Sequence, residues 1–251
     1  MPLVLRTVAE CRAWRATQGR RLGFVPTMGA LHAGHATLFQ RAKVANDLVL
    51  ASVFVNPTQF DDPRDFNLYP RTLAADSALL DAAGVDAVFA PSVEEMYPNG
   101  TRYLVHEDEL SGGLCGAHRP GHFIGMLTVV LKLLQIAQAD RAYFGEKDYQ
   151  QLELVRGLVK TFFVRTEIIA VPTVREADGL AMSSRNARLS PAERALAPRF
   201  HAALKSAPTA DAARAQLEAA GFRVDYVEDR DDRRFGAVHL GQTRLIDNVA
   251  R

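Results

Sequence analysis

The chain has 251 residues, of which 48% are hydrophobic and 24% are charged, so its composition excludes a disordered or fibrous protein. Its 30 lysines and arginines balance 29 aspartates and glutamates, which gives no broad electrostatic attraction to nucleic acid. Because only Cys11 and Cys115 are present and no apolar stretch reaches the roughly 20 residues of a spanning helix, we expect a cytoplasmic protein without a nucleic-acid or membrane partner.

The first three-quarters of the chain alternates strand-like and helix-like segments. A strand is expected over 21–25, a helix over 36–46, and a valine-rich strand over 48–55 that is covered on both faces. The alternation continues with a helix over 72–83, a strand over 85–90, a helix over 125–138, a strand over 141–144, a helix over 148–160 and a strand over 166–171. Strands and helices that alternate without tight hairpins predict an α/β fold, a Rossmann-like doubly wound parallel sheet.

The pattern changes near residue 176. The segment 175–186 has turn residues and little apolar content, and Ser190-Pro-Ala-Glu193 is a capping box that predicts a helix to about residue 205. A second helix is expected over 211–220, followed by strand-like pieces over 222–227, 237–240 and 244–246. We therefore expect two domains, residues 1–176 and a small α+β domain over residues 177–251.

The first candidate site segment is Pro26-Thr-Met-Gly-Ala-Leu-His-Ala-Gly-His35, between the first strand and the first helix. In an open parallel sheet this edge forms the ligand crevice, and a helix N-terminus there suits a phosphate. Gly29 and Gly34 allow close approach of the backbone to a nucleotide. His32 and His35, three residues apart, can donate hydrogen bonds to phosphate oxygens. The alternatives are two surface histidines that cap a helix, or a zinc site that lacks a nearby third ligand.

The second segment, Phe54 to Phe60, follows the second strand and opens into the same crevice. The amides of Asn56 and Gln59 both donate and accept hydrogen bonds, so they suit hydroxyls and a carboxylate on a small substrate. An Asn-Pro turn would explain Asn56 without any ligand, but it would not explain Gln59.

The third segment, Tyr143 to Gln151, is again a strand end followed by a helix start. Gly145 allows close backbone approach, and Lys147 supplies positive charge at a phosphate. Asp148 suits a ribose hydroxyl or a helix cap, and Gln150 offers another amide to a polar substrate. A solvated helix start of mixed charge is the alternative.

The fourth segment lies at the expected domain junction and contains Ser183, Ser184 and Arg185. Two hydroxyls and a guanidinium can close over a triphosphate, because arginine offers a bidentate fork to phosphate oxygens. A polar linker is the alternative. Arg71 and His122 each precede a helix and fit a structural role as well as a functional one.

Six segments in this order resemble the motifs of the pantoate–β-alanine ligase family: 26–35, 55–60, 69–72, 119–123, 144–151 and 174–186. The resemblance extends from about residue 3 to residue 248. It implies a nucleotidyltransferase-type Rossmann-like domain, a C-terminal domain that closes over the active site, and a homodimer. It also implies two half-reactions. Pantoate attacks the α-phosphorus of ATP to give pantoyl adenylate and pyrophosphate, and β-alanine then attacks the acyl carbon to give pantothenate and AMP.

The resemblance also implies roles for individual residues. The catalytic residues would be His32, His35, Lys147 and Arg185. The ATP-binding residues would be Met28, Gly34, Gly145, Lys147, Asp148, Ser183, Ser184 and Arg185. Asn56, Gln59 and Gln150 would bind pantoate. Magnesium would accompany ATP, with Asp76 associated with it indirectly, and no tightly bound organic cofactor is expected.

Two other functions remain open from the residues alone. Another H-x-G-H nucleotidyltransferase, of the cytidylyltransferase type, would use the same phosphate site. An aminoacyl-tRNA synthetase is disfavoured by the neutral charge and by the missing anticodon-binding domain. A non-catalytic ATP-binding module would retain the fold without turnover.

Overall fold

The computed structural model describes residues 1–61 and 66–251. Its larger sheet has six parallel strands in the order β1-β4-β3-β2-β5-β6. Their bounds are Leu3–Leu5 (β1), Leu22–Thr27 (β2), Leu48–Val53 (β3), Ala87–Phe89 (β4), Arg141–Gly145 (β5) and Glu167–Val171 (β6). The predicted doubly wound sheet is therefore confirmed. The edge strand β1 was not predicted, because three residues carry too little pattern to be recognised.

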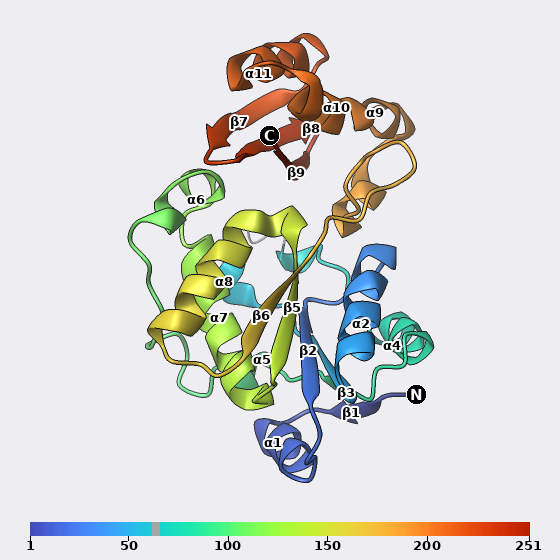
Figure 1. Cartoon of the computed structure of the whole chain (residues 1–251), viewed down its shortest axis with the longest axis vertical. Helices are drawn as coiled ribbons and strands as arrows, with labels where there is room; N and C mark the ends of the chain where they lie inside the picture. The colour runs from blue at the N-terminus through green and yellow to red at the C-terminus, as the bar shows by residue number, and fades with distance from the viewer. Residues whose placement is uncertain (62–65) are drawn as a thin grey trace.

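Helices cover both faces of this sheet (Figure 1). One face carries α2 (Ala33–Ala45) and α4 (Leu73–Ala82), and the other carries α1 (Val8–Ala16), α7 (His122–Ala137) and α8 (Tyr149–Thr161). Successive side chains of β2 point to opposite faces of the sheet: Phe24 packs in the core under α7 and α8, and Val25 packs in the core under α2 and α4. Three short helical segments, α5 (Val93–Met96), η2 (Leu110–Gly112) and α6 (Cys115–His118), lie between β4 and α7.

The C-terminal region, residues 177–251, forms a second layer with its own apolar core. It contains η4 (Ser184–Arg188), α9 (Pro191–Leu196), α10 (Pro198–Ser206), α11 (Ala210–Ala219) and an antiparallel sheet. That sheet has the order β7 (Arg223–Arg230), β8 (Arg233–Leu240) and β9 (Thr243–Ala250). The single helix predicted to residue 205 was wrong. It is divided at Ala197, because Pro198 has no N–H to continue the hydrogen-bond ladder.

The strands of this smaller sheet are longer than the sequence pattern predicted. Each spans eight residues, and charged side chains occupy many of the added positions. Arg234 of β8 is buried and donates to the Asp229 carboxylate and to the Ala207 carbonyl oxygen. A buried arginine with satisfied donors is invisible to a search for alternating apolar residues.

The carboxyl end of the parallel sheet faces the C-terminal region. β9 packs against η3 (Glu146–Asp148), the turn that joins β5 to α8, and Figure 1 shows the small sheet above that end of β5. The ends of β2, β3, β5 and β6 therefore open into a space between the two layers. Among the described helices, none combines the length and the apolar character required to cross a membrane. Cys11 and Cys115 are buried and unpaired.

Candidate active site

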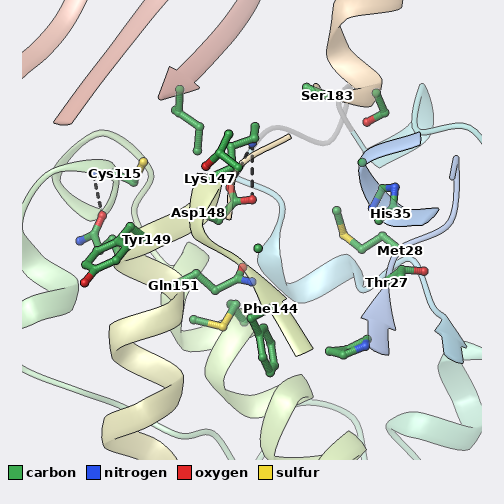
Figure 2. A pocket seen from close by; sticks show the side chains of 18 of the residues that line it. Thr27, Met28, His35, Cys115, Phe144, Lys147, Asp148, Tyr149, Gln151 and Ser183 are labelled. Atoms are coloured by element: carbon green, nitrogen blue, oxygen red, sulfur yellow. Dashed lines mark hydrogen bonds and ion pairs between the residues drawn. The ribbon is translucent and has the colours of Figure 1, made fainter. Parts of the chain in front are cut away.

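A cleft of about 310 Å³ lies between the strand ends and the C-terminal region (Figure 2). It brings together most of the residues singled out from the sequence. Those that line it are Met28, His32, Gly34, His35, Gln59, Gly145, Lys147, Asp148, Gln150, Ser183, Ser184 and Arg185. Asn56 and Asp76 are not among the lining residues, and both are buried.

The two histidines are held as a pair at the start of α2. His32 caps the helix: its Nδ1 accepts from the Gly34 N–H at 3.1 Å, and the His32 N–H donates to Nδ1 of His35 at 3.3 Å. The ring centroids are 4.1 Å apart. Because each Nδ1 accepts a backbone proton, each neutral ring carries its own proton on Nε2. The pair therefore presents two N–H donors.

Burial keeps both rings neutral. The pKa of His35 falls to about 3, first through burial and then through the neighbouring His32 and Lys147. The pKa of His32 is lowered by burial and by the charge of Lys147. Neutral imidazoles with Nε2 protons can donate hydrogen bonds to an anion over the physiological pH range.

Asp76 braces the loop that precedes this pair. Its carboxylate accepts from the N–H groups of Ala30 and Leu31, at 3.2 and 2.8 Å, and from the Thr72 hydroxyl at 3.2 Å. Gly29, with φ +80°, lies so close that a β-carbon there would be 2.9 Å from a carboxylate oxygen. Both oxygens of Asp76 are thus engaged by the chain. The expected indirect association with magnesium gains no support from these contacts, and the visible role of Asp76 is structural.

Asn56 also has a structural position rather than the expected contact with substrate. Its Nδ2 donates to Oε1 of Gln59 and to the Gly125 carbonyl, both at 3.1 Å, while its Oδ1 accepts from Tyr97 at 2.8 Å. With the side chain fully buried, its hydrogen-bonding capacity is used inside the protein. Asn56 thereby fixes the orientation of the Gln59 amide, which does line the cleft.

His122 holds the same segment from α7. Its Nδ1 lies 2.7 Å from the Gln59 carbonyl oxygen, and its Nε2 lies 3.0 Å from a guanidinium nitrogen of Arg119. Burial and the Arg119 charge lower the pKa of His122 to about 4, so the ring is neutral and donates to Gln59. Arg119 pairs with Asp61 at 2.9 Å. The structural interpretation of His122 accounts for these contacts.

Lys147 and Asp148 lie on the opposite wall from the histidines (Figure 2). Nζ of Lys147 is 3.3 Å from the nearer carboxylate oxygen of Asp148. Burial raises the pKa of Asp148, but the charges of Lys147 and Arg185 outweigh it, so the net pKa is lowered. Asp148 is therefore a carboxylate that can accept from hydroxyls.

The side-chain amide of Gln150 makes contacts that the sequence did not suggest. Gln150 donates to the carbonyls of Leu110 and Gly113 and accepts from the Cys115 N–H, so its amide is committed to the 110–115 segment. Gln151 also lines the cleft, and its side chain makes no hydrogen bond within the described part of the chain. Figure 2 shows it between Phe144 and the Lys147 loop. The sequence could not distinguish the two, because no element was predicted where Gln150 binds.

The segment 183–185 contributes from the C-terminal side. Ser183 caps η4 by accepting from the Arg185 N–H at 3.2 Å. Ser184 bonds to the half-buried Tyr69, whose pKa is raised by loss of solvent around the hydroxyl. The charge of Arg185 acts on Asp148 and Arg119, so it belongs to the same electrostatic environment as Lys147. The cleft thus combines the cations Lys147, Arg185 and Arg119, the last ion-paired with Asp61, with neutral donors, a suitable lining for a polyphosphate.

One end of the cleft is apolar. It is formed by one side of α7 together with β5, and its members include Phe123, Met126, Val130, Leu133 and Phe144. Among residues 1–61 and 66–251, no three histidine, cysteine, aspartate or glutamate side chains are grouped to hold a metal ion. The donor set therefore does not fit a magnesium ion held directly by the protein.

Comparisons with known proteins cover the whole chain. Residues 3–250 match the family model for pantoate-beta-alanine ligase. The pantothenate synthetase of Bdellovibrio bacteriovorus is 55% identical over 249 residues, which cover 99% of each chain. The structure of a Francisella tularensis pantoate-beta-alanine ligase, complexed with beta-gamma ATP and beta-alanine, has a TM-score of 0.95 at 40% identity and covers 100% of this chain and 98% of its own. Thermus thermophilus pantothenate synthetase has a TM-score of 0.93 at 45% identity, with 99% of each chain covered.

Proposed function

This chain belongs to the pantoate–β-alanine ligase family and catalyses the ATP-dependent condensation of pantoate with β-alanine, and we propose that it does so through a pantoyl adenylate formed in the cleft. The observation that carries this proposal is the composition of the cleft. Hydrogen-bond donors suited to phosphate, cations, a side-chain amide and an apolar wall all lie in one cavity at the strand ends. A carboxylate cannot acylate an amine until one of its oxygens becomes part of a good leaving group. AMP provides that leaving group.

The first half-reaction needs positioning and charge stabilisation rather than a covalent enzyme intermediate. The pantoate carboxylate attacks the α-phosphorus, and the bond from that phosphorus to the bridging oxygen of pyrophosphate breaks. We assign the Nε2–H groups of His32 and His35 to phosphate oxygens, where negative charge increases. Lys147 and Arg185 stabilise the same charge from the other walls, and Ser183 and Ser184 donate to the phosphates.

The nucleotide would lie along the strand ends. Met28, Gly34 and Gly145 border the cleft there, which supports contacts with ATP through the backbone. Asp148 is held as a carboxylate, so we assign it to the ribose hydroxyls. Because the described residues around the cleft form no magnesium site of their own, we propose that magnesium enters with the phosphates of ATP, and no step is assigned to it.

Pantoate combines a branched apolar part with hydroxyls and a carboxylate. We propose that the apolar end of the cleft takes the branched carbon and that Gln59 binds the polar groups. Gln151 replaces Gln150 as the second amide, since the amide of Gln150 is committed elsewhere. Asn56 acts on pantoate only through Gln59. In the second half-reaction the β-alanine amine attacks the acyl carbon, AMP departs with the bonding electrons, and the amine gives up a proton.

Three properties of the whole molecule complete the proposal. Residues 1–176 form the nucleotide- and pantoate-binding domain, and residues 177–251 form a small domain that closes over it, which the contact of β9 with η3 supports. The enzyme functions as a homodimer, as the family resemblance implies. The unpaired Cys11 and Cys115 support a reducing, cytoplasmic location.

Exchange of labelled pyrophosphate into ATP tests the adenylate. We expect exchange that requires pantoate and does not require β-alanine. Exchange with a different acid or an alcohol, and none with pantoate, would indicate another nucleotidyltransferase. Nucleotide binding without any exchange would indicate a non-catalytic module. In the same assay, Gln151→Ala should raise the pantoate concentration needed for half-maximal exchange about tenfold, or about 1.4 kcal/mol, with ATP binding retained.

A further inference from the structure

Asn248 of β9 connects the C-terminal sheet to the turn that carries Lys147. Its side-chain nitrogen donates to the carbonyl oxygens of Glu146 and Lys147, at 2.8 and 3.0 Å. The residue is 4% exposed and lies about a hundred positions away from that turn in the chain. An asparagine amide has two N–H donors, so both are used on consecutive peptide groups of the turn.

The orientation of this amide is fixed by Arg233 of β8. A guanidinium nitrogen of Arg233 donates to Oδ1 of Asn248 at 2.7 Å. The same guanidinium lies over the Tyr149 ring, 3.9 Å from its centroid, and 3.6 Å from the Glu146 carboxylate. A rotated amide would place its oxygen against two carbonyl oxygens and its N–H groups against a cation. The contacts therefore select one orientation of Asn248.

The backbone of Asn248 is anchored as well. Its carbonyl oxygen accepts from Arg175 at 3.3 Å, and Arg175 forms a bidentate pair with the buried carboxylate of Asp247 at 2.6 and 3.0 Å. Arg175 follows β6 in the chain and so belongs to the segment that joins the two layers. A displacement of β9 relative to the parallel sheet would be transmitted to the Lys147 turn through these bonds.

We propose that Asn248 is a positioning residue for adenylation: it holds the backbone of Lys147 where the ammonium can reach the phosphates, and it does so only while β9 is docked on the turn. This inference depends on the role proposed above for Lys147. Asn248 borders the cleft, but its side-chain nitrogen does not contact the substrate, since both N–H groups are occupied by the turn. A small misplacement of a charged group in a preorganised site lowers the rate steeply. The C-terminal region thereby determines where the Lys147 ammonium lies on one wall of the cleft.

The test is a double-mutant cycle on pantoate-dependent pyrophosphate exchange in the full chain. Asn248→Asp keeps the shape and the contact with Arg233 but turns an acceptor toward two carbonyl oxygens. We expect it to slow exchange at least about tenfold in the otherwise unchanged enzyme. In the Lys147→Ala background we expect less than about a twofold further loss, because no ammonium is left to position. Asn248→Ala, which adds no repulsion, should show the same non-additivity with a smaller loss, and it serves if the aspartate variant does not fold.

Val238→Ala is the matched control. Val238 is fully buried in the core of the same sheet and pairs with Val224 and Leu245, away from the Lys147 turn. It should lower the unfolding temperature and leave exchange within twofold of the unmodified enzyme. Full additivity of Asn248→Asp and Lys147→Ala would overturn the inference alone. A normal exchange rate in Lys147→Ala would instead overturn the proposed role of Lys147, and with it the inference.

Discussion

Two turns of similar design face each other across the cleft, and they are stabilised in different ways. Residues 26–35 and 145–151 each carry the chain from a strand of the parallel sheet into a helix. The first turn is held by hydrogen bonds within α2 and by Asp76 of α4, all on the same side of the cleft. The second turn is held by Asn248, from the C-terminal sheet. One wall of the cleft is therefore held by contacts within its own layer, whereas the other depends on docking of a second layer.

The largest effect should follow removal of the brace of the first turn. Asp76→Ala leaves two partly buried N–H groups and a hydroxyl without their acceptor, and hydrogen bonds to a charged group contribute about 1.5–3 kcal/mol each. We expect the free energy of unfolding to fall by about 3–4 kcal/mol in urea denaturation, less than the sum of the three bonds, because water can reach these partly buried groups. Asp81→Ala on the same helix is the control, since that side chain is 51% exposed and should change stability by less than about 0.5 kcal/mol. Equal effects of the two variants would contradict a self-contained first turn.

The next largest effect concerns the histidine pair itself. His35→Ala removes an Nε2 donor and also the Nδ1 acceptor that orients His32. We expect pantoate-dependent pyrophosphate exchange to fall at least about a hundredfold, or roughly 2.7 kcal/mol of transition-state stabilisation. His106→Ala, whose side chain is 60% exposed and pairs with Asp108, should retain the normal rate. A near-normal rate in His35→Ala would mean that Lys147 and its neighbours, rather than the histidines, provide most of the transition-state stabilisation.

The same contrast explains what the sequence could predict. The positions of His32 and His35 depend on a three-residue spacing, and the sequence placed them on one helical turn correctly. The parallel sheet was likewise predictable, because alternation of strands and helices is a local pattern. The contacts of Asn248 and of Gln150 were missed for another reason: their partners lie about a hundred and about forty residues away. The Asn56 side chain was assigned to substrate for the same reason, since Tyr97 and Gly125 lie far from it in the chain.

A pH experiment tests whether neutral His122, which holds the Gln59 segment, contributes to stability. The pKa of His122 is about 4 in the folded chain, through burial and Arg119, against an ordinary value of 6.5. On acidification the unfolded chain is protonated first, so this stabilisation is complete above pH 6.5 and is lost as pH falls toward 4. We expect His122→Gln to remove about 3 kcal/mol of the loss in unfolding free energy between pH 7 and pH 4. An unchanged pH slope in that variant would mean that protonated His122 is accommodated.

The smallest effect on stability should come from Gly145, at the start of the second turn. Nothing lies within 4 Å of a β-carbon built on Gly145, and its φ of −76° suits any residue, so Gly145→Ala should change the unfolding free energy by less than about 0.5 kcal/mol. At the first turn, a β-carbon on Gly34 would lie 2.9 Å from the His32 ring, so Gly34→Ala disturbs the histidine pair even without ligand. If the nucleotide passes close to Gly145, the added methyl group should raise the ATP concentration needed for half-maximal exchange several-fold while the fold is unchanged. Unchanged ATP dependence in Gly145→Ala would show that glycine is not needed there for the nucleotide, and that the second turn contributes mainly the charge of Lys147.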